Sequence, residues 1–154
     1  MGHFVRVFCA SPLVPPVRKV IEWAAQKGCK LKMDPDTAPA DQEKTDWRRV
    51  GIIYKDNHTP FYIEVNMDDD SGSHLREEID EYSKFLNNVD DSSDKNKALQ
   101  HLRKTKFIVS NEIPAQFADE GYLALGVFLT YFVQHCDGMI QVDGEGIKQK
   151  LKVT

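Results

Sequence analysis

Alternating hydrophobic and polar positions predict several β-strands in this chain. In residues 61–67 the odd-numbered side chains are apolar, whereas Tyr62, Glu64 and Asn66 point to the opposite side. Residues 4–9 are apolar on both sides except at Arg6, which is typical of a central, largely buried strand. Further strands are predicted at Cys29–Met33, Trp47–Lys55, Phe107–Val109 and Met139–Val142, and Lys148–Thr154 is expected to add an edge strand or to fray.

Apolar residues at intervals of three and four predict helices between these strands. Residues 17–28 show this spacing, and Gly28 stands where a helix-terminating glycine belongs. Residues 75–89 form an amphipathic pattern, and a shorter helix is predicted around residues 98–102.

The segment Tyr122–Val133 predicts a helix of a different kind, because Thr130 is its only residue that is neither a large apolar side chain nor glycine or alanine. This helix is expected to begin at Asp119 or Glu120 and to end before Gly138. A helix without a polar face must be covered on every side by the protein core or by a second molecule. A membrane span needs about 20 apolar residues, so we expect no membrane association.

The order of the predicted elements is β-α-β, β-β, α-α, β-α-β. We therefore predict a single α+β domain over residues 1–154, with a mixed β-sheet and helices packed on it. Strands joined through a helix are usually parallel, so the strands flanking residues 17–28 are expected to run in parallel.

The charge of the chain is concentrated in its middle. The net charge is −4, and residues 61–100 contain 11 acidic and only 4 basic side chains. An acidic surface repels phosphate backbones, so a nucleic-acid partner is not expected. The three cysteines lack metal-type spacing, no cofactor motif is present, and no signal-peptide pattern follows Met1, so we expect a cytoplasmic protein without a cofactor.

The acidic middle is the strongest candidate for a binding surface. A run of acids is usually only a solvated face, but it can also dock a basic protein by electrostatic steering. The predicted partner-binding residues are Asp68, Asp69, Asp70, Glu77, Glu78, Asp80 and Glu81, and Asp90, Asp91 and Asp94 extend the same stripe.

A calcium site is a weaker hypothesis for the same region. Asn66, Asp68, Asp70 and Glu77 occupy positions 1, 3, 5 and 12 of a calcium-binding loop. The position that requires glycine holds Ser71, and a strand precedes the loop where a helix is needed. Acids at a helix start are also stabilised by the free amides there, so no metal is predicted.

Catalytic residues cannot be assigned from the sequence, and three weak candidates stand at strand ends. Cys9 ends the first strand before a helix, where a thiol can become nucleophilic, although most cysteines in apolar strands are core residues. Asp143 and Glu145 follow the last buried strand, where a plain turn would equally need the neighbouring glycines.

The sequence favours a small soluble protein that acts by binding, as an inhibitor or antidote-like module does, through its acidic middle. The alternative is a small enzyme with its site around Cys9, Asp143 and Glu145. A homodimer joined through the apolar helix is compatible with both.

Overall fold

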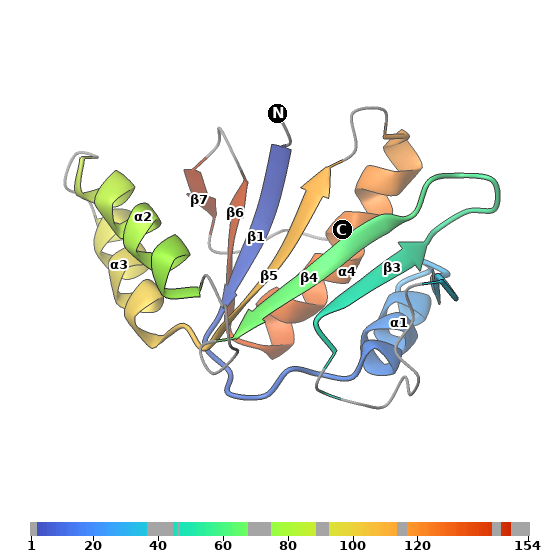
Figure 1. Cartoon of the computed structure of the whole chain (residues 1–154), viewed down its shortest axis with the longest axis horizontal. Helices are drawn as coiled ribbons and strands as arrows, with labels where there is room; N and C mark the ends of the chain where they lie inside the picture. Colours follow the sequence, from blue (N-terminus) through green and yellow to red (C-terminus); the bar gives the residue numbers. More distant parts are fainter. Residues whose placement is uncertain are drawn as a thin grey trace.

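Seven strands and four helices make up the computed structural model, which describes residues 3–36, 45, 47–67, 75–88, 93–113, 117–142 and 146–148 (Figure 1). The strands are β1 (His3–Cys9), β2 (Lys32–Met33), β3 (Arg49–Ile53), β4 (Phe61–Met67), β5 (Phe107–Ile113), β6 (Gly138–Val142) and β7 (Gly146–Lys148). The helices are α1 (Val17–Gln26), α2 (Leu75–Asn87), α3 (Ser93–Lys104) and α4 (Asp119–His135). The predicted α+β class and all four helices are confirmed.

The sheet has the order β2-β3-β4-β5-β1-β6-β7, and every neighbouring pair is antiparallel. The predicted mixed sheet is therefore wrong. The strands β1 and β2 do run in the same direction, but β5, β4 and β3 lie between them. In the same way α4 connects β5 to β6 across β1, which pairs with both. The connections through α1 and α4 thus each pass at least one strand that the chain supplies from elsewhere, and α2 and α3 join the antiparallel neighbours β4 and β5, so no parallel pair forms.

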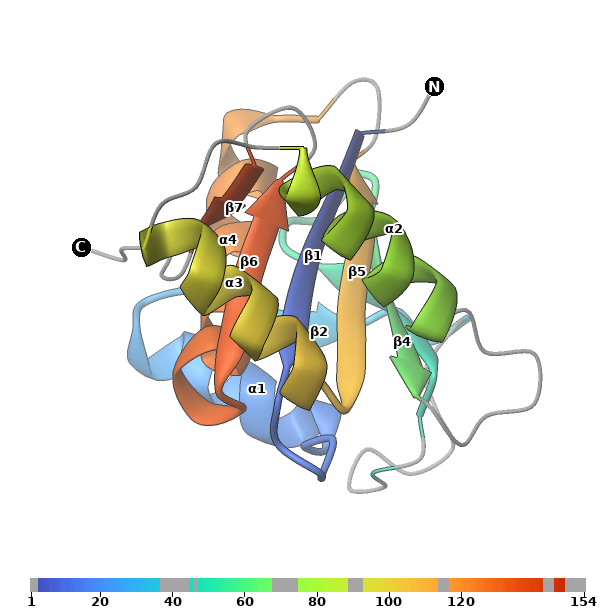
Figure 2. The ribbon, with the colours of Figure 1, turned by 90° about the vertical axis from the view of Figure 1, so that its left-hand side faces the viewer.

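Two helices cover each face of the twisted sheet (Figures 1 and 2). On one face α1 and α4 pack against the alternate residues Val5, Val7 and Cys9 of β1 and their neighbours in the other strands. On the other face α2 and α3 enclose a smaller core around Phe8 and Ile108. The period-two alternation of the strands thus divides the apolar residues between two separate cores.

The apolar helix α4 lies at the centre of the larger core. Its Phe128 and Phe132 are fully buried, and the Phe128 ring packs edge-on against Phe61 at a centroid distance of 5.9 Å. The sheet and α1 cover this helix from within the same chain. Cover from within the chain is incomplete near the N-terminal end of this helix, where Leu123 is 72% exposed and Tyr122 is 47% exposed. Cover of these two residues by a second molecule stays a prediction. None of the helices in the described part of the chain has the length and hydropathy of a membrane span.

Strand boundaries differ from the prediction mainly at the sheet edges. The hairpin of β3 and β4 is confirmed, whereas β2 contains only two residues because it pairs with a single neighbour at the edge. The second edge is formed by β7 at residues 146–148, and residues 149–154 lie outside the described part of the chain.

Two glycines fix how helices lead into strands. Gly28 has a φ of 84°, the left-handed conformation that terminates α1 as predicted. Gly138 opens β6 directly against α4, and a Cβ there would lie 2.6 Å from Val7 Cγ1 and 2.7 Å from the Phe132 carbonyl oxygen. Only glycine allows this close approach between the end of α4 and the sheet.

Candidate functional site

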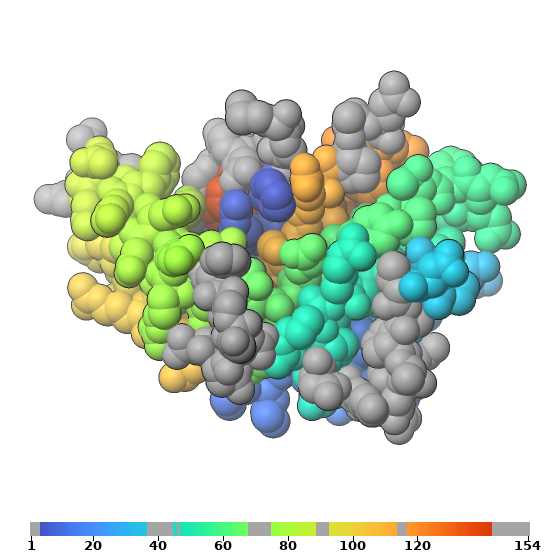
Figure 3. Space-filling model, viewed as in Figure 1, coloured from blue at the N-terminus to red at the C-terminus, as the bar shows by residue number. Residues whose placement is uncertain are grey.

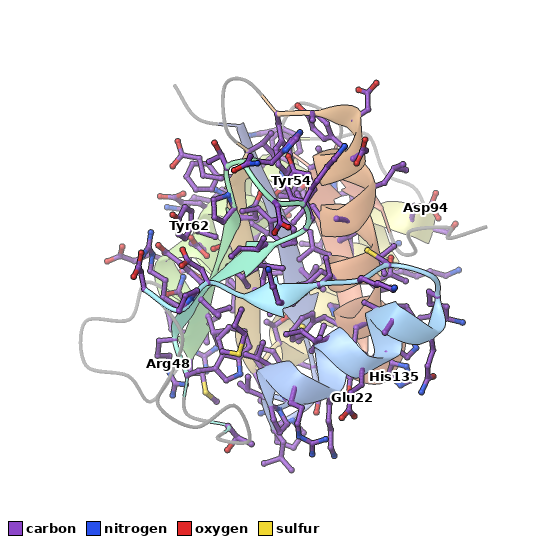
Figure 4. All side chains as sticks on the ribbon, turned by 90° about the vertical axis from the view of Figure 1, so that its right-hand side faces the viewer. Glu22, Arg48, Tyr54, Tyr62, Asp94 and His135 are labelled. Atoms are coloured by element: carbon purple, nitrogen blue, oxygen red, sulfur yellow. The ribbon has the colours of Figure 1, made fainter. Side chains whose placement is uncertain are left out.

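Among the described residues, the helices α2 and α3 cover only part of their side of the sheet. Their core takes Phe8, Ile108 and Met139 from β1, β5 and β6, and among the described residues it takes none from β3 or β4. In Figure 3, α2 stands on one side and β3 and β4 on the other, with parts of β1 and β5 visible between them. Tyr62 of β4 projects from this side of the hairpin, opposite α4 (Figure 4). We call this part of the sheet the open face.

Polar residues cross this side of the sheet in a single line, which runs from the buried Gln141 and Ser110 to the exposed Arg49. Strand pairing places Arg6 opposite both Gln141 and Ser110, Glu64 opposite Ser110, and Arg49 opposite Glu64. Directly opposed residues in an antiparallel sheet point to the same face, so these five side chains form one row across five strands. We call Gln141, Arg6, Ser110, Glu64 and Arg49 the polar row.

Arg6 is the centre of the polar row. Its Nη1 donates to Gln141 Oε1 at 3.0 Å, and its Nε lies 4.0 Å from Glu78 Oε1 of α2. The side chains of Arg6 and Glu78 are only 23% and 26% exposed, so both charges are partly removed from water. Partial burial of a charged pair costs desolvation energy that an apolar pair would not. The polar row therefore stabilises the fold less than apolar residues would in the same positions. This makes it a candidate for binding.

The outer end of the polar row is accessible to solvent. Arg49 Nε lies 3.4 Å from Glu64 Oε1, and both side chains are more than half exposed. The Arg49 guanidinium also lies over the Tyr62 ring, 4.6 Å from its centroid. An exposed, planar cation held over an aromatic ring offers donors to a partner without losing much rotamer freedom on binding.

Helix α2 forms a wall beside the open face. Residues seven apart on a helix lie within about 20° of each other, so Phe85 shares the flank of Glu78, which contacts Arg6. Aromatic contacts lead from the core to this flank, with ring centroids 5.8 Å apart for Phe8 and Tyr82 and 5.4 Å apart for Tyr82 and Phe85. Phe85 itself is 53% exposed. A large exposed aromatic residue supported from below is typical of an interface anchor.

The predicted partner-binding residues that the structure describes differ in exposure. Glu77, Asp80 and Glu81 are exposed on the solvent side of α2, whereas Glu78 is half-buried and turns towards Arg6. Asp94 is exposed at the start of α3. Asp68, Asp69, Asp70, Asp90 and Asp91 lie outside the described residues. On α2 itself, the exposed basic residues Arg76 and Lys84 lie on either side of the acidic residues 77–81.

Cys9 lies in the interior beneath α4. The thiol is fully buried, and burial, Cys136 and Asp137 all raise its pKa well above the usual range. Burial also raises the pKa of Cys136 to about 12. A nucleophilic thiol needs the opposite, a lowered pKa and access to substrate. The structure therefore favours the core role for Cys9, and Asp143 and Glu145 lie outside the described residues.

The calcium hypothesis cannot be completed from the described residues. Asn66 is the last residue but one of β4 and Glu77 lies in the first turn of α2, while Asp68 and Asp70 are outside the described part. Within the described ranges no group of three histidine, cysteine or acidic side chains is placed to hold a metal ion.

Sequence reasoning missed the polar row and Phe85. Arg6 was the available signal, because a lone charge in an otherwise apolar strand needs a partner. Its partners lie 135 and 72 positions along the chain, so the spacing of residues could not reveal them.

No protein-family model, curated protein or solved structure matches this chain. Function is therefore inferred from the arrangement of its own residues.

Proposed function

We propose that this protein is a non-catalytic binding protein that docks a basic partner protein on α2 and the adjoining open face. One observation supports the proposal above the others. Exposed Phe85 stands on the same helix as the exposed acidic residues Glu77 and Glu81, and Glu78 of that helix contacts Arg6 of the polar row.

The charge of α2 would guide the encounter. Glu77, Asp80 and Glu81 are exposed within little more than one helical turn. A concentrated charge of one sign accelerates association with a partner of opposite sign, and salt screens the effect over about 10 Å. The excess of 11 acidic over 4 basic side chains in residues 61–100 extends this field.

The aromatic residue would hold the complex together once formed. Hot spots in interfaces are often aromatic side chains that enter a pocket of the partner and become desolvated. Phe85 is already supported by Tyr82, so little conformational freedom is lost on binding. The partner is therefore expected to present an apolar pocket surrounded by lysine or arginine.

The alternative of a small enzyme depends on Cys9, Asp143 and Glu145. The burial and raised pKa of Cys9 remove the thiol from that group as a ready nucleophile. No observation among the described residues favours a reaction over binding, so the enzyme remains the second hypothesis.

The test compares three variants with the original protein, using a partner that has been captured from a cell extract and then purified. The variant Glu77→Gln/Asp80→Asn/Glu81→Gln is expected to associate about tenfold more slowly at low salt. Phe85→Ala is expected to dissociate about 30-fold faster, which corresponds to about 2 kcal/mol. The matched control Glu22→Gln/Asp56→Asn/Asp119→Asn changes three exposed acids elsewhere and should bind normally.

Stopped-flow or surface-plasmon measurements at several salt concentrations provide the readout. The proposal fails if association is insensitive to salt, or if the α2 variant and the control variant bind equally well. Thermal unfolding of all variants excludes misfolding as the cause of any loss.

A further inference from the structure

A cleft lies on the far side of α3 from α2, and the side chains that α3 contributes to it are basic, whereas the exposed side of α2 is acidic. A cleft of about 450 Å³ separates α3 from the turn that joins α4 to β6. Figure 2 shows α3 in front of β6 and close to this end of α4. The size is within the range of pockets that hold small molecules.

Basic side chains from α3 line one wall of this cleft. Lys97, His101 and Lys104 are spaced by four and three residues, so they project from one side of the helix. The axial separation of Lys97 and Lys104 is about 10 Å, and lysine side chains are long enough to meet on one ligand between them. Among the described residues, Lys104 pairs with Asp137 whereas Lys97 has no ion pair, so the charge of Lys97 is available.

The ring of His101 is fixed between the two lysines. Its Nε2 lies 2.7 Å from the Phe8 carbonyl oxygen, and because a carbonyl can only accept, Nε2–H must donate. The same bond ties α3 to the end of β1. The position of the wall is thus set by the sheet before any ligand arrives.

The opposite wall carries one acid. Asp137 Oδ2 lies 3.4 Å from Lys104 Nζ, and both side chains are exposed. Asp137 has a φ of 49°, and its carbonyl oxygen accepts from the Ala10 amide, so the turn is held against β1. Asp137 forms an ion pair with Lys104, so its carboxylate would compete with a bound anion for the Lys104 ammonium group.

We propose that this cleft binds the phosphoryl group of a small phosphorylated metabolite. A phosphomonoester carries a charge of about −1.5 to −2 and three acceptor oxygens, enough to engage both ammonium groups at once. A single carboxylate has less charge and fewer acceptors for two lysines. The cleft also has room for a small organic group attached to the phosphate. This site is independent of the proposed protein-docking surface.

The test is a titration of the whole chain with inorganic phosphate and with glycerol 1-phosphate, followed by ¹⁵N chemical shifts at constant pH and ionic strength. Shifts should be confined to α3 and residues 137–139, and the ester should bind at least as tightly as phosphate. Lys97→Gln/Lys104→Gln should weaken binding at least tenfold. Lys19→Gln/Lys30→Gln, which removes two exposed lysines elsewhere, should not.

Asp137→Asn gives the sharpest result because the expected change is a gain. Asparagine adopts the left-handed conformation as readily as aspartate, so the turn is retained. Removal of the competing charge should tighten phosphate binding about threefold to tenfold. The proposal is overturned if shifts spread over lysines throughout the surface, if the ester does not bind, or if Asp137→Asn leaves affinity unchanged.

Discussion

The two faces of the sheet differ in how much of their surface is apolar and buried. The side covered by α1 and α4 carries one continuous apolar core, in which Phe61, Phe128 and Phe132 are fully buried. The side covered by α2 and α3 has a small core at one end and the polar row beyond it. Both faces are built from the same strands, so the difference comes from alternate residues along each strand and not from the choice of elements.

This difference indicates which side supplies most of the stability, and the other side is the one that we propose to bind a partner. Burying apolar surface stabilises a fold by about 25 cal/mol per Å², so the α1/α4 side supplies most of the folding free energy. The polar row contributes little net stability, because the desolvation of Arg6 and Glu78 offsets their attraction. Substitutions on the α1/α4 side should therefore mainly lower the free energy of unfolding. Substitutions on the α2/α3 side should mainly weaken the proposed binding of a partner.

The largest effect is expected from comparing two phenylalanines. Phe128→Ala on the α1/α4 side should lower the free energy of unfolding by about 3–5 kcal/mol, because it leaves a cavity in a fully packed core. Phe85→Ala on the other side should cost less than about 1 kcal/mol, since half of its surface is already in water. Urea unfolding followed by circular dichroism measures both. Equal losses would show that the two sides contribute alike to stability.

Gly138→Ala should have the next largest effect. The added methyl group would meet Val7 and the backbone of α4, and relieving this overlap should cost about 1–3 kcal/mol. Gly28→Asn is a suitable control, because asparagine tolerates a positive φ and the space around Gly28 is open. Thermal unfolding of the two variants checks the prediction, and a Gly138→Ala protein as stable as the control would contradict the close packing of α4.

The sequence was informative wherever local pattern decides structure. Period-two alternation identified β4 and its inward side, helical spacing identified α1 and α2, and Gly28 marked the end of α1. Each of these signals depends only on neighbours within a few residues. The prediction of a mixed sheet failed because strand pairing depends on which strands enter between β1 and β2 and between β5 and β6, and local spacing does not encode that choice.

The candidate site was predictable only in part for the same reason. The acids of α2 were visible as a run of charge in residues 77–81. Arg6, Ser110 and Gln141 come from three strands that are distant in sequence, and only their register brings them into one row. Phe85 was hidden because an apolar residue in an amphipathic helix is expected to face the core, whereas its position in α2 places it on the flank.

Arg6 provides the test of whether the polar row exists for stability. Arg6→Met alone should cost about 1–2 kcal/mol, because it removes the guanidinium that lies 4.0 Å from the half-buried Glu78 carboxylate. Arg6→Met combined with Glu78→Leu should restore or exceed the stability of the original protein, since an apolar pair needs no desolvated charge. Denaturant unfolding gives the comparison. A double variant less stable than either single variant would mean that the ion pair itself stabilises the fold.

The smallest effect is expected at the exposed end of the row, where Arg49 and Glu64 oppose each other across β3 and β4. A double-mutant cycle with Arg49→Met and Glu64→Gln should give a coupling of only about 0.2–1 kcal/mol, the range of exposed cross-strand ion pairs. Because water screens both side chains, the coupling should largely disappear in 1 M salt. The contact of Arg49 with Tyr62 is unaffected by Glu64→Gln, so the cycle isolates the ion pair from the aromatic contact.

A coupling above about 2 kcal/mol that persists in salt would place this end of the row in a drier setting than its exposure indicates. The open face would then contribute to folding as the α1/α4 side does, and the contrast between the two faces would no longer hold.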